Sequence, residues 1–592
     1  MPTALQTLEK AFREAIREVT GIEADPLVQP SGNPELADYQ SNAAMGLVRQ
    51  VSASGGKTTP RLLAERIREA VEPKLAGVAG EVAVAGPGFI NVRLAPAYVA
   101  KRVEAMLRDP LCGVEPTPNP QRVVVDYCGV NAAKEMHVGH LRSTIIGDAV
   151  CNVLEALGHT VIRQNHVGDW GTQFGMLIAH LETAGAQGEG GTGKAQPGGG
   201  TGDTGGVAIR DLEAFYRAAK QRFDTDPAFA ELARKKVVAL QSGDPSARQL
   251  WTHILNATRD HYERVCRRLG VRLTRADERG ESSYNDDLPN VVRELKEKGL
   301  AVESEGAVAV FIDGPEKPPL IVEKSGGGYL YGTTDLAAAR YRAGVLKADR
   351  VLYFVDQRQS QHFAQVFKTA AAAGWTGQTR FEHAGFGTMM GPDGKPFKTR
   401  SGDVVKLEEL LDEAEERALA VVREKNPDLP PQRQREVARA VGIGAVKYAD
   451  LSKDRISDYV FDWNRMLSLE GNTAVYLQYA YARVRGIFRK GGIDPSAVHG
   501  QVCLETPSEL ALGKHLIRFP EVLESVAREL KPHMLCTYLY ELAGRFSVFY
   551  GACEVLSAAT GVRESRLLLS EATARTLRYG LGLLGIECPE EI

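Results

Sequence analysis

The feature that most constrains the fold is a strand, a loop, a helix and a second strand in direct succession between residues 121 and 171. The run QRVVVDY (121–127) is rich in β-branched residues, as expected for a buried parallel strand. The loop CGVNAAKEMHVGH follows it, then the helical pattern LRSTIIGDAVCNVLEALGH, then the strand-like run VIRQNHVGDWG. Such a βαβ unit predicts an α/β domain built on a parallel sheet.

Length and patterning divide the chain into three parts. At 592 residues it is too long for one hydrophobic core. Residues 1–110 combine helical patterns with two short alternating strands, which predicts an N-terminal α+β domain. Residues 111–458 open with a proline-rich joint and carry the βαβ pattern and a helical insertion. Residues 459–592 have helical patterns almost throughout, which predicts an α-helical bundle.

A glycine-rich tract at residues 184–206 contains no packing residues and is expected to be a flexible surface insertion. It includes a pattern similar to a phosphate-binding loop, Gly188-x-x-x-x-Gly193-Lys194. Ala195 stands where that loop needs a Ser or Thr for Mg²⁺, and a helical pattern precedes it instead of a strand. We therefore reject a phosphate-binding loop at this position.

Composition excludes several classes of protein. With 43% apolar and 25% charged residues the chain is neither disordered nor fibrous, and no run approaches the roughly eighteen apolar residues of a membrane span. Residues 1–19 form an amphipathic helical pattern and not a secretory signal, so we expect a cytoplasmic protein that binds no membrane. The eight cysteines form no C-x-x-C pair, which favours buried thiols over disulfides or structural zinc. The net charge is −3, so nucleic acid would bind through local basic patches.

The sharpest motif is His137-Val-Gly139-His140, between the buried strand and the start of the helix. Free backbone N–H groups and the helix dipole make this corner an anion site. Gly139 allows a nucleotide to approach the backbone, and two imidazoles can donate hydrogen bonds to phosphate oxygens. Two alternatives are incidental histidines and a metal-binding pair. A metal would need a third ligand at suitable spacing, and none is nearby.

The run from Asn131 to Thr144 resembles the HIGH signature of class I aminoacyl-tRNA synthetases, in the form found in the arginyl family. Other stretches match the same family in order along the chain: 38–42 (DYQSN), 165–175 (NHVGDWGTQFG), 331–336 (YGTTDL), 359–363 (QSQHF), 461–463 (FDW) and 470–483 (EGNTAVYLQYAYAR). The glycine tract is the one sizeable piece without a counterpart in the family pattern.

The resemblance implies that ATP and L-arginine give arginyl-adenylate and pyrophosphate, after which arginine moves to the terminal ribose of tRNA(Arg). It implies ATP with Mg²⁺ as a substrate, no protein-bound structural metal, a monomer, and a need for tRNA in efficient activation. The fold class expected is α/β: a class I Rossmann-like parallel-sheet catalytic domain, an N-terminal α+β domain that contacts tRNA, and a C-terminal α-helical bundle that binds the anticodon.

The resemblance also assigns catalytic and ATP-binding residues. His137 and His140 would stabilise the triphosphate, Gly139 would lie under the adenine, and His362 would contact ATP. The second signature of the class departs from its usual form, because Lys395-Pro-Phe-Lys398-Thr-Arg puts Pro396 where the first lysine is expected. Lys395 or Lys398 supplies the charge from a shifted position, or Lys134 beside the first signature replaces it. Taken alone, the segment has the pattern of a solvated basic turn.

Recognition of arginine requires acids, because a carboxylate accepts two of the five donors of a guanidinium in parallel. In the family, Asp126 and Asp335 occupy positions that read the substrate. Tyr331 would contact the guanidinium, while Asn131 and Gln359 would hold the α-amino and carboxylate ends. Taken alone, Asp335 has the pattern of a helix N-cap ahead of Leu336. A site of this kind rejects analogues without those donors by about 10⁴ to 10⁵, so we expect no editing domain.

Two regions are expected to touch tRNA. Tyr476 and Tyr479 lie three residues apart and can stack on anticodon bases, with Arg483 one turn later on a phosphate. The alternative is an aromatic stripe in the core of the bundle. The N-terminal module resembles the one that arginyl enzymes place on the outer corner of tRNA, with candidates Tyr39, Asn42, Phe89 and Asn91. Tyr39 and Phe89 equally suit a core.

Two rival functions remain at this stage. A non-catalytic tRNA-binding relative would explain the missing lysine of the second signature, but the intact HVGH motif, Asp335 and Gln359 oppose it. A sister class I synthetase, for instance for cysteine, commonly binds a zinc ion in its catalytic site. The scattered cysteines of this chain offer no such cluster.

Overall fold

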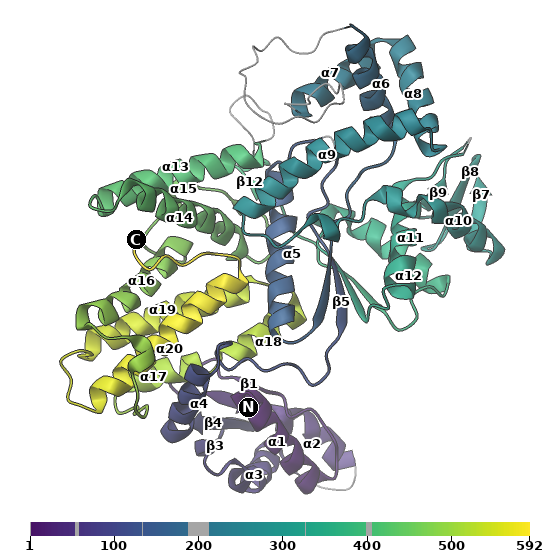
Figure 1. Ribbon diagram of the computed structural model, residues 1–592. Helices are drawn as coiled ribbons and strands as arrows, with labels where there is room; N and C mark the ends of the chain where they lie inside the picture. The colour runs from purple at the N-terminus through teal and green to yellow at the C-terminus, as the bar shows by residue number, and fades with distance from the viewer. Residues whose placement is uncertain (1, 54–57, 133, 188–211, 326, 398–404) are drawn as a thin grey trace.

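The computed structural model describes residues 2–53, 58–132, 134–187, 212–325, 327–397 and 405–592. Figure 1 shows the N-terminal domain at one end of the molecule, the parallel sheet and its helices in the middle, and the C-terminal helices along one side. The predicted fold class is confirmed: helices cover a parallel sheet, with an α+β domain before it and a helical domain after it.

The N-terminal domain packs helices on a four-stranded antiparallel sheet. The helix α1 (Ala4–Thr20) forms because Leu8, Phe12 and Ile16 place a buried stripe on one face. Thr3 caps its start, accepting a hydrogen bond from the backbone N–H of Gln6, and Gly21 ends it in the left-handed region. The sheet order is β1 (Val28–Pro30), β2 (Tyr39–Ser41), β4 (Phe89–Leu94) and β3 (Ala79–Ala85), and the other helices are α2 (Ala43–Ala53), α3 (Pro60–Val71) and α4 (Pro96–Arg108).

The central sheet has four parallel strands in the order β11, β10, β5, β6. The middle strand β5 (Arg122–Asp126) is buried at each of its three valines and leads through the HVGH loop into α5 (Val138–Ala156). From β5, the chain adds β6 (Thr160–Gln164) on one side and β10 (Arg350–Tyr353) and β11 (Arg380–His383) on the other. The strand order therefore reverses between β5 and β10, and open α/β sheets bind ligands at the carboxyl ends of strands beside such a point.

Two insertions flank this sheet. Between β6 and β10 lie first α6 (Thr172–Gln187), α7 (Leu212–Thr225), α8 (Pro227–Gln241) and α9 (Pro245–Arg268). They are followed by α10 (Leu288–Glu297), the antiparallel sheet β7 (Ala301–Ser304), β8 (Ala307–Val310) and β9 (Leu320–Glu323), and then α11 (Tyr331–Gly344). The helix α12 (Ser360–Ala372) joins β10 to β11. The predicted glycine tract begins within α6, and from residue 188 to 206 it lies outside the described residues.

The C-terminal part is helical apart from one short strand. The pair β12 (Met389–Met390) and β13 (Tyr459–Val460) ties the end of the α/β region to it. Its helices are α13 (Leu407–Lys425), α14 (Pro431–Leu451), α15 (Trp463–Met466), α16 (Ala474–Gly491), α17 (Pro507–Leu516), α18 (Phe519–Glu529), α19 (His533–Ala552) and α20 (Val562–Leu583). Helices α17 and α20 also pack against α4 of the N-terminal domain.

Candidate active site

The HVGH motif forms the N-terminal corner of α5, and its two histidines cap the helix reciprocally. The Nδ1 atom of His137 accepts a hydrogen bond from the backbone N–H of Gly139 at 3.1 Å. The Nδ1 atom of His140 accepts one from the backbone N–H of His137, also at 3.1 Å. The two rings lie 4.0 Å apart between centroids. Because both Nδ1 atoms are acceptors, each neutral imidazole carries its proton on Nε2 and can donate it to a ligand.

The surroundings keep these two imidazoles neutral. Burial lowers the pKa of His137, and nearby Lys134 lowers it further. Burial, with His137 beside it, lowers the pKa of His140 to about 3. Both rings are therefore neutral donors at physiological pH, and they stabilise negative charge without a preceding change of protonation.

Gly139 is required by a close approach. A Cβ atom at this position would lie 2.8 Å from Cε1 of His137, closer than real Cβ contacts. The glycine itself is exposed, so its backbone face is open to a ligand. Glycine therefore serves two purposes at this position. It leaves room for the ring of His137, and its open backbone allows a flat group to lie against the chain.

The loop after β5 is held in shape by the loop after β6. Cys128 adopts a left-handed conformation with φ of 76°, and the backbone N–H of the following Gly129 donates to the side chain of Asn165 at 3.0 Å. Asn131 pairs with Gly168 in an isolated bridge, and a Cβ on Gly168 would lie 2.6 Å from Oδ1 of Asn131. Asn131 is thereby fixed at the surface beside the HVGH corner.

The chain on either side of the second signature forms backbone hydrogen bonds. Residues 389–397 form a tight hairpin in which Lys395 is exposed, and Lys398 lies outside the described residues. Where the described chain resumes, the backbone N–H of Val138 donates to the carbonyl of Val405 at 3.1 Å, and that of Leu407 donates to the carbonyl of Met136 at 2.9 Å. The segment that follows the second signature is thus hydrogen-bonded to the first signature, more than 250 positions earlier in the chain.

Lysines around this corner differ in their contacts. Lys134 places its Nζ 4.5 Å from the centre of the Tyr216 ring in α7, while its charge still acts on both histidines. Lys406, which the sequence motifs did not single out, forms an ion pair with Glu135 at 2.8 Å. Lys134 and the exposed Lys395 are therefore the described candidates for a phosphate contact.

Asp335 lies in the first turns of α11 and not at its cap. The helix begins at Tyr331 with Leu330 as N-cap, so the interpretation of Asp335 as an N-cap is wrong. Its Oδ2 lies 2.6 Å from Nε2 of His362 in α12. The Tyr331 ring stands edge-on to His362 at 4.9 Å and is 65% exposed. Three predicted residues from two helices thus meet, and the exposed Gln359 sits at the start of α12.

Glu281 is a further acid of this region that the sequence motifs did not indicate. Burial, together with the charges of Asp169 and Asp335, raises its pKa to about 8. Asp169 is itself buried and accepts hydrogen bonds from the backbone and hydroxyl of Ser282 at 2.8 and 2.6 Å. The carboxyl of Glu281 is repelled by two others from separate segments, which disfavours its ionised form unless a cation joins them. No local pattern around Glu281 marks this role, because the grouping is tertiary.

Asp126 at the end of β5 already has a cationic partner. Its Oδ2 accepts a hydrogen bond from Nη2 of Arg342 in α11 at 2.8 Å, and Nε of Arg342 donates to Gln164 of β6 at 2.7 Å. Arg342 is fully buried and stacks over Tyr353, and its Nη1 has no hydrogen-bond partner among the described residues. These two contacts join α11, the helix that carries Asp335, to the central strand β5 and the edge strand β6.

The start of α5 is also tied to the C-terminal helices. Arg142, two residues after His140, is buried and pairs with the buried Asp450 of α14 at 3.1 Å. It also donates to the carbonyl of Ser457 at 3.0 Å and lies over the ring of Tyr459 in β13. The HVGH corner and strand β13 therefore share one anchor, Arg142.

Comparison with known proteins decides the family. The pattern "tRNA synthetases class I (R), catalytic domain" matches residues 102–463. "Arginyl tRNA synthetase N terminal domain" matches 6–94, and "DALR anticodon binding domain" matches 477–592. Relatives named arginine–tRNA ligase include those of Laribacter hongkongensis, 51% identical over all of both chains, and Alteromonas mediterranea, 52% identical over 99% of each.

The chain belongs to the arginyl-tRNA synthetases. Its structure is similar to that of the Plasmodium falciparum arginyl-tRNA synthetase, with a TM-score of 0.84 and 28% identity over all of both chains. It is also similar to the Thermus thermophilus arginyl-tRNA synthetase, with a TM-score of 0.79 and 27% identity over 99% of this chain and all of the other. The protein is an arginine–tRNA ligase that uses ATP, so the predicted family and activity are confirmed.

In this synthetase the predicted anticodon residues lie on α16. Tyr479 is 48% exposed, and Arg483 is exposed and extends over the ring of Tyr550 at 5.0 Å. Tyr476 is half-buried and packs against Tyr540 of α19, with ring centroids 5.5 Å apart. Tyr479 and Arg483 are therefore open to a ligand, while Tyr476 combines a packing contact with partial exposure.

The N-terminal candidates divide into two groups. Tyr39 is 1% exposed, and its hydroxyl donates to the carboxylate of Glu521 in α18 at 2.9 Å. Its assignment to the tRNA surface is wrong, because the side chain joins the N-terminal domain to the C-terminal helices. Phe89 and Asn91 point to the other face of the sheet, half-exposed, where Gln40 donates to Asn91 at 2.8 Å. Asn42 is partly exposed and directly follows Ser41, which pairs with Ile90 between these two residues.

Among the described residues, no group of three or more His, Cys, Asp or Glu side chains is placed to hold a metal ion. All eight cysteines lie in described segments, and all are free thiols. Within those same segments, no helix has the length and apolar character to cross a membrane.

Proposed function

We propose that the enzyme activates L-arginine at the carboxyl ends of β5 and β10, with ATP on the HVGH corner and the guanidinium between Glu281 and Asp335. The observation that carries this assignment is the contact of Asp335 with His362 beside Tyr331, with Glu281 near enough for the charge of Asp335 to raise its pKa. A guanidinium supplies the positive charge that this group lacks, and carboxylates match its planar donors.

The ATP end follows from the donors of α5. An arginine carboxylate oxygen attacks the α-phosphorus of ATP, and pyrophosphate leaves from the opposite side. The two Nε2–H groups of His137 and His140 donate to phosphate oxygens as charge builds, with Gly139 under the adenine. Lys134 and Lys395 add positive charge, and Lys398 belongs to the same assignment by its sequence position. Mg²⁺ enters chelated by ATP as part of the substrate, so no structural metal is required.

The remaining groups hold the amino-acid end. Asp126 has one oxygen committed to Arg342, and its Oδ1 has no hydrogen bond among the described residues. We assign this oxygen to the α-ammonium of arginine, together with the side chain of Asn131. We assign Gln359 to the carboxylate end of arginine and His362 to a contact with ATP. In the second step, the terminal ribose hydroxyl of tRNA attacks the carbonyl carbon of the adenylate, and AMP leaves.

The tRNA contacts are assigned to two surfaces. Tyr479, Tyr476 and Arg483 of α16 receive the anticodon, because exposed aromatic rings stack on bases of any sequence and Arg483 meets a phosphate. Asn42, Phe89 and Asn91 of the N-terminal domain receive the outer corner. We further propose a cytoplasmic monomer that needs bound tRNA(Arg) for rapid adenylate formation.

Pyrophosphate exchange with and without tRNA tests this assignment. Asp335→Asn should raise the KM for arginine by about tenfold to a hundredfold, because a charge-assisted hydrogen bond is lost while the ATP end is intact. The matched control is Asp286→Asn, an exposed acid on the same turn as Glu281, which should leave this KM unchanged. An unaltered KM in Asp335→Asn would remove the acid pair from the site.

A further inference from the structure

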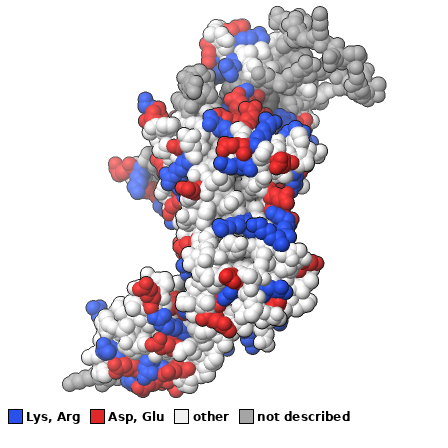
Figure 2. Space-filling model, turned by 90° about the vertical axis from the view of Figure 1, so that its left-hand side faces the viewer, with Lys and Arg blue, Asp and Glu red and all other residues white. Residues whose placement is uncertain are grey.

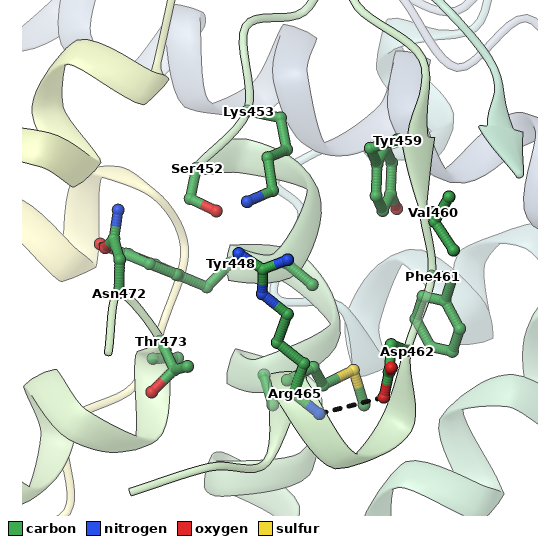
Figure 3. A pocket seen from close by; sticks show the side chains of 14 residues that line it. Tyr448, Ser452, Lys453, Tyr459, Val460, Phe461, Asp462, Arg465, Asn472 and Thr473 are labelled. Carbon is green, nitrogen blue, oxygen red and sulfur yellow. Dashed lines mark hydrogen bonds between the residues drawn. The ribbon is translucent and has the colours of Figure 1, made fainter. Parts of the chain in front are cut away.

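A second pocket, outside the site described above, lies where the end of α14 meets α15 and the start of α16 (Figure 3). The cavity is small, with a volume of about 50 Å³, and it opens to solvent on one side. Tyr448, Ser452 and Lys453 line it from α14 and the residues just after, and Arg465 lines it from α15. Asn472 closes it just before α16. None of these residues serves the activation chemistry proposed above.

Two cations extend into this pocket. Figure 3 shows the side chains of Lys453 and Arg465 side by side, pointing toward its middle from different segments of the chain. No ion pair or hydrogen bond of either side-chain head group is found within the described ranges. Burial and the neighbouring Arg465 lower the pKa of Lys453, so the two charges repel each other. Two like charges held together, each without an ion pair, are unfavourable unless an anion joins them.

The acid that lines the same pocket has one of its two oxygens engaged at the start of α15. Asp462 caps α15, accepting hydrogen bonds from the backbone N–H groups of Asn464 and Arg465 at 2.8 and 3.1 Å. A lysine just beyond the C-terminus of α14 is favoured by the helix dipole. The helix dipole does not account for Arg465, because this residue lies on α15 and its side chain extends into the same pocket.

Neutral donors complete an anion site. The Tyr448 hydroxyl lies 2.6 Å from Oδ1 of Asn472 and 2.9 Å from the carbonyl oxygen of Cys536, so two acceptors share its one proton. The Asn472 NH₂ group has no hydrogen bond among the described residues. The Ser452 hydroxyl lines the pocket without a hydrogen-bond partner among the described residues. A phosphate group between these side chains would receive charge-assisted hydrogen bonds on several of its oxygens.

The position favours a phosphate of a polynucleotide. The residue after Asn472, Thr473, caps α16, the helix that carries Tyr476, Tyr479 and Arg483. Figure 2 shows the side of the molecule that carries α13 to α16, and a band of Lys and Arg crosses the middle of that face. A polynucleotide whose bases contact α16 therefore has its sugar–phosphate backbone close to this pocket.

We propose that this pocket binds a backbone phosphate of tRNA, held by Lys453 and Arg465 with Ser452 and Asn472, as a contact separate from base recognition on α16. The proposal rests on the proposed function in one respect, namely that α16 faces tRNA. A free phosphate has the same chemistry, so the experiment distinguishes the two sources.

The experiment measures the Kd of full-length enzyme for tRNA(Arg) by fluorescence anisotropy at several salt concentrations. Arg465→Gln and Lys453→Met should each weaken binding about tenfold, and each should reduce the slope of log Kd against log salt by about one. Lys453→Arg should retain affinity, because it keeps the charge. Arg293→Gln, on α10 at the far side of the molecule in Figure 1, is the matched control and should not change Kd.

Two further measurements separate the outcomes. Tyr479→Ala tests the α16 surface: if it weakens binding while the pocket variants do not, the pocket proposal fails and the proposed function stands. If neither Tyr479→Ala nor the pocket variants weaken binding, the pocket proposal and the placement of tRNA on this face both fail. Titration with inorganic phosphate alone tests a small-anion site. If the variant that combines Arg465→Gln with Lys453→Met loses phosphate binding but keeps its affinity for tRNA, the proposal is overturned.

Discussion

Replacing Glu281 with glutamine tests how the acid group reads arginine. In the free enzyme the pKa of Glu281 is raised to about 8, by burial first and then by Asp169 and Asp335. At pH 7 this carboxyl is therefore ionised in about one molecule in ten, whereas the guanidinium of arginine is always charged. Arginine binds the ionised form, so binding at pH 7 should release nearly one proton from the protein.

The size of the effect follows from the pKa of Glu281. Each decrease of one pH unit below pH 8 should raise the KM for arginine about tenfold, equivalent to about 1.4 kcal/mol, and above pH 8 the KM should level off. Glu281→Gln should remove this pH dependence. At pH 8.5 it should also raise the KM about tenfold to a hundredfold, through loss of a charge-assisted hydrogen bond.

Calorimetric titration with arginine in buffers of different ionisation enthalpy measures the released protons directly. The wild-type enzyme should release about 0.9 proton per arginine at pH 7, and Glu281→Gln close to none beyond what the other groups contribute. Stability provides a second readout. Because the pKa is higher in the folded than in the unfolded state, Glu281 stabilises the fold least above pH 8. Glu281→Gln should therefore gain in Tm relative to wild type as pH rises from 5 to 8.5. Equal proton release in both proteins would refute the reasoning.

Three other substitutions test single contacts. His140→Ala should lower the rate of pyrophosphate exchange about 10² to 10³-fold with little change in tRNA affinity. The wild-type rate should show no loss from imidazolium formation at His140 between pH 8 and 6, since its pKa is about 3; an unchanged rate in the variant would contradict its role. Arg342→Met should cost about 3–5 kcal/mol in urea unfolding by leaving Asp126 unpaired, and adding Asp126→Leu should restore part of it. Tyr39→Phe should cost about 1–3 kcal/mol by removing the donor to Glu521, with unchanged tRNA affinity; a loss of affinity alone would return Tyr39 to the tRNA surface.

Local patterns sufficed for the catalytic corner. A buried strand, a loop and a capped helix are set by residues close in sequence, so the βαβ unit and the HVGH motif were predictable with their place in the fold. The way in which His137 and His140 cap the helix with their own rings was not anticipated, because imidazoles are uncommon caps. That capping determines which nitrogen faces the ligand.

The errors have one cause in common. Asp335 was taken as a possible cap because a helical run follows it, whereas α11 begins four residues earlier and buries Thr333 and Thr334. Tyr39 was placed on a surface because nothing nearby shows that α18 covers it with Glu521. In both cases the answer depends on a packing partner that is remote in the chain.

The sequence by itself determined the family, the chemistry and the order of the elements, because the signatures are short and their conformations depend on neighbouring residues. Tertiary structure alone decided which acids meet. Glu281, Asp169 and Asp335 come from three segments, and the partner of Asp126 is Arg342, 216 positions away. Electrostatic energy depends on distance and burial in space, and neither can be read from spacing along the chain.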